Sequence, residues 1–99
     1  MAHPVLMVMV RFRSKLSLDE VMKVAEERAP RFRALEGLQQ KYYFQDPESG
    51  EIGGLYLWES SESAAEYQKS ELRASIAAAY QVEGAPRVEV FRVMMPLRP

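Results

Sequence analysis

The chain of 99 residues contains no cysteine, no threonine and no asparagine, and its only histidine is His3. The absence of cysteine excludes disulfides, cysteine metal sites and thiol nucleophiles. His3 precedes Pro4, which holds the backbone extended at the very start of the chain. We therefore do not expect this histidine to act as a catalytic base, and much of the usual catalytic chemistry is missing.

The chain also lacks an excess of one charge and a long apolar run. Its net charge is −1 and its sequence pI is about 5.9, without the basic footprint of a nucleic-acid-binding protein. The apolar run Val5–Val10 is too short to span a membrane and has no signal-peptide pattern. We expect a cytoplasmic protein, with no nucleic-acid or membrane partner, folded as a single domain over residues 1–99.

The first half of the chain predicts a strand, a helix and a second strand. The apolar run Val5–Val10, followed by Arg-Phe-Arg13, predicts a strand, and Ser17-Leu-Asp-Glu20 is a capping box that starts a helix. Pro30 is expected to kink this helix or to end its first part, and Gly37 is a natural stop. Its apolar positions recur at helical spacing: Leu18, Val21, Met22, Ala25, Ala29 and Phe32.

The second half predicts a hairpin, a bent helix and a last strand. Residues 38–45 and 54–58 are strands joined by the turn Asp46-Pro-Glu-Ser-Gly50. Ser60 or Ser61 caps the next helix, and a slip in its apolar phase predicts a bend near Ser70. That helix has its apolar stripe at Ala64, Tyr67, Leu72, Ile76, Ala79 and Tyr80. Gly84-Ala-Pro86 is expected to end the helical region, and residues 88–95 to form the last strand.

The resulting order, βαββαβ, indicates an α+β, ferredoxin-like fold with a four-stranded antiparallel sheet and helices on one face. The first strand is apolar on both of its faces, so both faces need cover. Helices can cover one face. We expect a second copy of the chain to cover the other, which makes the protein a homodimer through its open sheet face.

An RNA-recognition domain has the same order of elements. It requires exposed aromatic residues in a basic motif on the sheet. The last strand, Val88-Glu-Val-Phe-Arg-Val93, does not contain that motif. The sequence therefore gives no support to RNA binding.

Three passages resemble a known group of proteins: Val10-Arg-Phe12, Gly37-Leu38 with Lys41-Tyr-Tyr43, and residues 53–80, which begin Gly-Gly-Leu-Tyr-Leu-Trp-Glu-Ser. They are similar to the antibiotic-biosynthesis-monooxygenase group of dimeric α+β barrels, and most of all to its YdhR-like branch. The resemblance implies a dimeric α+β barrel with an apolar pocket between sheet and helices in each subunit. Relatives include oxygenases that need no cofactor and haem-degrading enzymes.

The chain departs from the haem-degrading branch at two positions. Tyr67 stands where that branch has a helical tryptophan, and Ala77 stands where it has the histidine that binds haem iron. Without that imidazole there is no axial ligand, so we expect neither haem degradation nor a metal or cofactor. Many other members carry histidines at the Tyr67 position and near Leu72, and both are missing here.

The resemblance and the apolar patterns together suggest a substrate-binding set of Tyr67, Trp58, Tyr43 and Leu72, with no catalytic residue identified. Tyr67 lies on an apolar helix face, where its hydroxyl either enters a pocket or bonds a backbone carbonyl in the core. Trp58 either lines the pocket or only packs in the core or in the dimer interface. Tyr42 and Tyr43 point to opposite faces of their strand, so only one of them can enter the pocket.

Two cations are further candidates. Arg11 and Lys41 can stabilise an anionic substrate if their side chains turn inward. The alternative, which we favour on the sequence alone, is an interfacial ion pair with Glu59 or Glu89.

These residues leave two hypotheses for function. The first is a cofactor-independent monooxygenase that acts on a small phenol-like or quinol-like aromatic in an apolar pocket. The second is a noncatalytic dimeric module that binds a small apolar or aromatic ligand or another protein.

Overall fold

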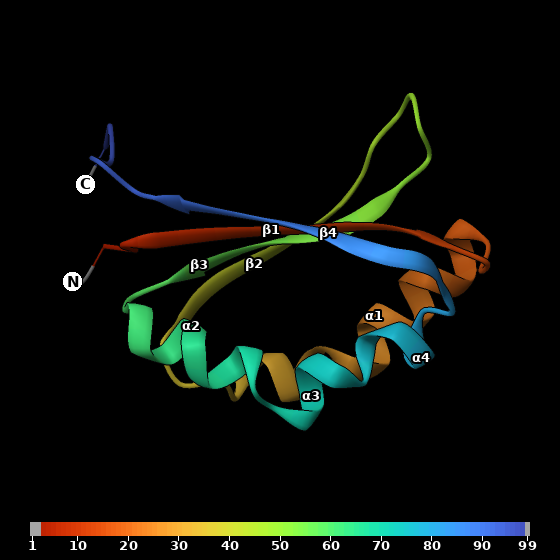
Figure 1. The fold of residues 1–99 in the computed structure, drawn as a ribbon, viewed down its shortest axis with the longest axis horizontal. Coiled ribbons are helices and arrows are strands. Elements are labelled where there is room, and N and C mark those ends of the chain that lie inside the picture. The colour runs from red at the N-terminus through yellow and green to blue at the C-terminus, as the bar shows by residue number, and fades with distance from the viewer. Residues whose placement is uncertain (1–2, 99) are drawn as a thin grey trace.

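A four-stranded antiparallel sheet with every helix on one face forms the fold (Figure 1). The computed structural model describes residues 3–98, and its strands follow the spatial order β2-β3-β1-β4. The elements are β1 (Leu6–Ser14), α1 (Leu18–Arg33), β2 (Leu38–Gln45), β3 (Ile52–Trp58), α2 (Ser61–Gln68), α3 (Glu71–Ala74), α4 (Ile76–Ala79) and β4 (Val82–Arg92). The predicted α+β, ferredoxin-like βαββαβ arrangement is confirmed.

Helix α1 begins at the predicted capping box but does not stop where expected. The Ser17 N–H donates to Glu20 Oε1 (2.9 Å), and the Glu20 N–H donates to Ser17 Oγ (3.2 Å). The helix continues through Pro30 to Arg33, so the prediction that Pro30 ends part of it is wrong. Pro30 and Glu26 are both exposed, and water can reach the carbonyl that the proline leaves unpaired.

Gly37 does not cap α1, because the cap residue is Ala34. Gly37 instead belongs to the turn that enters β2, where its φ of +84° suits a residue without a side chain. A Cβ at this position would also overlap the side chain of Ser63 at the start of α2. The glycine therefore sets how closely this turn approaches α2.

The second helical region is broken at the predicted position. Ser60 caps α2 by accepting a hydrogen bond from the Ser63 N–H (3.1 Å). Ser70 Oγ then donates to the Tyr67 carbonyl (2.6 Å) and accepts from the Arg73 N–H (3.1 Å). One serine thus ends α2 and starts α3, which confirms the predicted bend.

Strand β4 begins earlier and ends earlier than predicted. It spans Val82–Arg92, so Gly84-Ala-Pro86 lies inside the strand rather than before it. The β1–β4 register shifts between the pairs Arg11–Arg87 and Arg13–Glu83, which leaves this segment opposite Phe12 in a bulge. Because β4 is an edge strand, a proline at this bulge breaks no required ladder bond.

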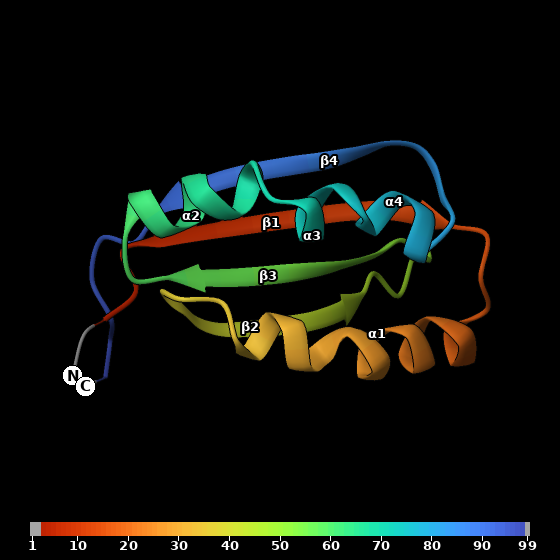
Figure 2. The same ribbon diagram turned by 90° about the horizontal axis from the view of Figure 1, so that it is seen from below.

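The core lies between the sheet and the helices. Figure 2 shows α1 along β2 and the α2–α4 segment along β1 and β4. Buried side chains of both layers meet there: Val8, Val10, Phe12, Ile52, Tyr56, Trp58, Val21, Phe32, Ala64, Tyr67, Ile76 and Tyr80. In α1, Arg28 takes a buried position, while Leu18 and Met22 of the predicted apolar stripe are half exposed.

The opposite face of the sheet is covered by no element of residues 3–98 (Figure 1). The strand registers place Met7, Met9, Leu55, Leu57 and Phe91 on this bare face. A second subunit packed against it stays a prediction. Within the same residues, no helix has both the length and the apolar character to cross a membrane.

Candidate functional site

A bulge in β2 lets Leu38, Lys41 and Tyr43 all face the helices. Leu38 pairs with Trp58 and Gln40 pairs with Leu57, so β2 has one residue more than β3 over this stretch. Beyond the bulge, Lys41 pairs with Tyr56 and Tyr43 pairs with Gly54, on the face of β3 that is buried. Since side chains alternate along a strand, the extra residue keeps both ends of β2 turned inward.

A cavity of about 200 Å³ lies between α1 and the inner face of β1, β2 and β3. Its wall is largely apolar and includes Val10, Phe12, Val21, Ala25, Ile52 and Ile76. Lys41 is the only charged side chain among the described residues that line it. A cavity of about 150 Å³ accommodates a benzene molecule, so this one fits a single substituted ring.

Gly54 makes room for Lys41 to cross β3. A Cβ on Gly54 would lie 2.9 Å from Lys41 Cε and 3.1 Å from Tyr56 Cε1. The bare backbone of Gly54 therefore forms the floor under the lysine side chain. The Gly53-Gly54 pair shapes the cavity from within a strand.

Lys41 Nζ lies in a box of three aromatic rings. It is 3.6 Å from the ring centroid of Phe32, 4.4 Å from that of Tyr43 and 4.7 Å from that of Tyr56. The ring faces attract an ammonium ion. No described carboxylate of the same chain pairs with Lys41, and an ion pair with Glu59 or Glu89 across a subunit interface stays a prediction.

Burial makes Lys41 a weak base for a lysine. Desolvation lowers its pKa to about 7, and the neighbouring Arg28 cation acts in the same direction. At neutral pH both the amine and the ammonium are populated. Lys41 can therefore accept a proton from a ligand or hold an anion, in an otherwise apolar cavity.

Arg11 has a different environment, on the opposite face of the sheet. It pairs with Asp46 and with Glu51 (3.3 Å) at the β2–β3 turn. The backbone N–H groups of Glu48 and Ser49, followed by Arg11, lower the pKa of Asp46 to about 2. Within the chain, the partners of Arg11 are thus the carboxylates of the hairpin rather than Glu59 or Glu89.

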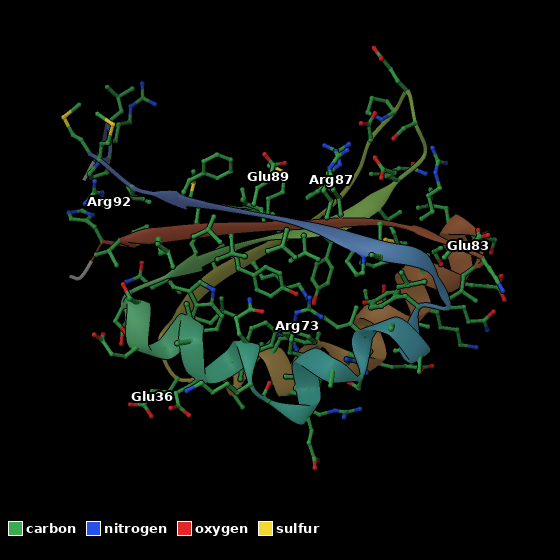
Figure 3. All side chains as sticks on the ribbon, in the orientation of Figure 1. Glu36, Arg73, Glu83, Arg87, Glu89 and Arg92 are labelled. Atoms are coloured by element: carbon green, nitrogen blue, oxygen red, sulfur yellow. The ribbon has the colours of Figure 1, made fainter. Side chains whose placement is uncertain are left out.

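Arg28 and Arg73 add positive charge to the interior. Arg28 is the only charged residue buried among those described, and its Nη2 donates to Ser75 Oγ (2.9 Å) and to the Leu72 carbonyl (3.4 Å). The labelled Arg73 side chain lies between the helices and the sheet (Figure 3). The Nε atoms of both arginines are buried without a hydrogen-bond partner in the described structure. The interior therefore favours an anion.

Tyr67 and Trp58 lie in an aromatic core beside the cavity rather than in its wall. The hydroxyl oxygen of Tyr67 is 3.2 Å from that of Tyr56, not on a backbone carbonyl. Trp58 is stacked parallel to Tyr56 at a ring separation of 6.4 Å and is 1% exposed. Burial raises the pKa of Tyr56 and of Tyr67, so both phenols stay neutral. Tyr67 reaches the cavity only through Tyr56.

The four predicted site residues occupy different places. Tyr43 lines the cavity, whereas Tyr67, Trp58 and Leu72 do not. Leu72 lies over the core and uses its carbonyl to accept hydrogen bonds from Arg28 and Ser75. Whether any of the four binds a substrate stays a prediction.

Only partial signals in the sequence indicate that Tyr56 and Arg28 belong to the interior. Tyr56 shares a strand face with Trp58, and Arg28 recurs with Val21, Ala25 and Phe32 at helical spacing. A buried stripe that contains an arginine is detectable by that spacing. The described residues contain no cluster of three histidine, cysteine or carboxylate side chains that could hold a metal ion.

Solved structures share this fold at low sequence identity. NE2512, a protein of unknown function from Nitrosomonas europaea, superposes with a TM-score of 0.79 at 14% identity, over 100% of this chain and 98% of its own. SnoaB, a cofactor-independent oxygenase from Streptomyces nogalater, gives 0.75 at 12% identity, over 97% and 99%.

A "putative antibiotic biosynthesis monooxygenase" from Caulobacter crescentus gives a TM-score of 0.75 at 17% identity, over 94% of this chain and 92% of its own. These similarities confirm the ferredoxin-like α+β fold with its four-stranded antiparallel sheet. No functionally curated protein matches the chain in sequence. The profile of one family, described as "Putative mono-oxygenase ydhR", matches residues 5–98, and the chain belongs to this family.

Proposed function

We propose that the protein is a cofactor-independent monooxygenase that oxidises a small phenol or quinol in the cavity beneath α1. The observation that carries this proposal is Lys41 Nζ, which faces an apolar cavity from an aromatic box and has no described carboxylate partner. Membership of the family and the similarity to SnoaB support the same class of reaction.

In this reaction, the neutral amine of Lys41 takes the proton of the substrate hydroxyl. The ammonium then holds the phenolate, and the positive interior around Arg28 and Arg73 stabilises the anion. An electron-rich phenolate can reduce O₂ itself once it is held in a dry, oriented site. The balance is RH₂ + O₂ → R=O + H₂O, and the substrate supplies all four electrons.

We further propose that two copies associate through the bare sheet face. Apolar side chains of β1, β3 and β4 gather there, and the register places Met9 between Leu55 and Glu89 in the middle of the face. Figure 3 shows Arg87 and Glu89 on the same side of the sheet, where they can pair across the interface. Each subunit keeps its own cavity, because the cavity opens on the helical side.

The direct test is oxygen uptake by the purified protein with a panel of monocyclic and bicyclic phenols and quinols. Lys41→Met should lower kcat by about 10²–10⁴-fold, the usual contribution of a positioned general base. Lys23→Met, which removes an exposed lysine of α1, should leave the rate unchanged. The wild-type rate should rise with pH and level off above about 7, because the base must be neutral. Equal rates for both variants would refute the proposed role of Lys41.

One observation favours the second candidate, a noncatalytic ligand-binding module. Tyr67, Trp58 and Tyr56 are closely packed, and the two phenols satisfy each other. Saturable binding of a phenol with no oxygen uptake over the whole panel would favour this candidate.

A further inference from the structure

The surroundings of Lys41 are those of a nucleophilic amine as well as of a proton acceptor. A lysine becomes a nucleophile when it is desolvated in an apolar pocket or lies beside a second cation. Lys41 is half-buried, borders the apolar cavity and contacts the Phe32 ring face at 3.6 Å. Arg28 is the second cation, and it is near enough to disfavour the ammonium form of Lys41.

The position of Nζ also allows a reactant to reach it. Lys41 and Tyr43 line the apolar cavity and, on their other side, a more polar hollow of about 310 Å³ that includes Arg33 and Gln40. No described carboxylate blocks the amine by pairing with it. The amine therefore lies between an apolar compartment suited to a ring and a polar hollow open to water.

We propose that Lys41 Nζ forms an imine with a monocyclic aromatic aldehyde or ketone bound in the cavity beneath α1. This carbonyl chemistry goes beyond the monooxygenase reaction and does not depend on it. It assigns to the same cavity a second class of ligand, one that is held covalently.

The step balances without an oxidant or reductant. The Nζ lone pair attacks the carbonyl carbon and forms a carbinolamine. The two hydrogens of the amine then leave with the carbonyl oxygen as water, and a C=N bond replaces the C=O bond. An apolar cavity favours condensation, because it keeps bulk water away from the imine.

The test traps the imine on the intact protein. Wild-type protein is incubated under nitrogen with benzaldehyde and sodium cyanoborohydride, and the reduced adduct is located by peptide mass mapping. We expect the adduct at Lys41 to form at least ten times faster than at the other lysines, which are Lys15, Lys23 and Lys69. Adducts on the α-amino group, which also reacts with aldehydes, are quantified separately in the same peptide mass maps.

Three controls separate cavity chemistry from general amine reactivity. Lys41→Arg keeps the charge but cannot form the adduct. Ala25→Leu fills the cavity and should slow labelling of an intact Lys41 at least tenfold, because Ala25 is a buried lining residue. If this variant does not fold, Met22→Trp enlarges a half-exposed lining side chain with the same expected effect. With wild-type protein, 1-pyrenecarboxaldehyde is too large for the cavity and should not label Lys41.

Equal labelling of all lysines, or labelling of Lys41 that the cavity-filling variants and the larger aldehyde do not diminish, would overturn the proposal. The two proposals for this cavity fail separately. If oxygen uptake depends on Lys41 but no imine is trapped, only the imine proposal fails. If the imine is trapped but no oxygen is consumed, only the monooxygenase proposal fails.

Discussion

The hydroxyl oxygens of Tyr56 and Tyr67 lie 3.2 Å apart, in a buried pair that joins β3 to α2. Tyr56 lines the cavity, while Tyr67 lies behind it. The position of the Tyr56 hydroxyl therefore depends on a residue that does not face the cavity. Tyr67 thus holds the Tyr56 hydroxyl from behind the cavity wall.

Tyr67→Phe should destabilise the protein by about 1–3 kcal/mol, because the Tyr56 hydroxyl is then buried without a partner. Tyr56→Phe should cost a similar amount. The double variant should cost less than the sum of the two, since both polar groups are then gone. Urea unfolding of the four proteins measures this cycle, and additive costs would show that the two hydroxyls do not interact.

The buried amine of Lys41 should make stability depend on pH. Its pKa in the folded protein is about 7, against an ordinary value of 10.5. Between these values the unfolded chain binds a proton that the folded chain does not bind, so stability rises with pH across that window. Wild type should therefore gain stability relative to Lys41→Met between about pH 7 and about pH 10. Denaturant unfolding at several pH values measures the stability of both proteins. The same pH dependence in wild type and in Lys41→Met would contradict the low pKa.

Two glycines in strands should differ in their tolerance of alanine. A Cβ on Gly53 would overlap the carbonyl oxygen of Val10 in the neighbouring strand, so Gly53→Ala should cost about 3 kcal/mol. A Cβ on Gly84 meets nothing within 4 Å, and only its φ of +72° opposes the change, which costs about 1 kcal/mol. Thermal or urea unfolding distinguishes the two variants, and equal losses would show that the neighbouring strand yields to a Cβ at Gly53.

Association through the bare face can be tested with one charge. Met9→Glu puts a carboxylate in the middle of that face and should weaken the dimer at least about 100-fold, because an unpaired buried charge costs several kcal/mol. Met94→Glu makes the same change at a side chain that is 95% exposed and should have no effect. Light scattering gives the mass of each protein in solution. A monomeric wild type would remove the proposed dimer.

The order and type of most elements could be predicted because their signals are local. The Ser17–Glu20 box and the Ser70 bend depend on hydroxyl groups that bond backbone a few residues away. The length of β4 could not be predicted, because Pro86 is acceptable within this strand only where the strand lies at the edge of the sheet. Local sequence carries no information about which strand becomes an edge.

The site was less predictable because it depends on which face of each strand turns inward. Leu55 and Leu57 are as apolar as Tyr56 and Trp58, so the period of β3 does not choose its buried face. The bulge in β2 falls at Gln39-Gln40, where no glycine or proline indicates a bulge in the sequence. The sequence alone therefore favoured an interfacial ion pair for Lys41, although Lys41 lines the cavity.

The two ends of β2 take their register from different neighbours. Leu38 follows the turn from α1, whereas Lys41 and Tyr43 follow the tight hairpin in which the Asp46 N–H donates to the Glu51 carbonyl. A hairpin one residue longer or shorter would reverse Lys41 and Tyr43 and leave Leu38 in place. The wall would then gain Tyr42 and lose the amine of Lys41. Loop length alone could thus divide related proteins into those with a basic chamber and those with a neutral one, without a single change in the residues of the strand.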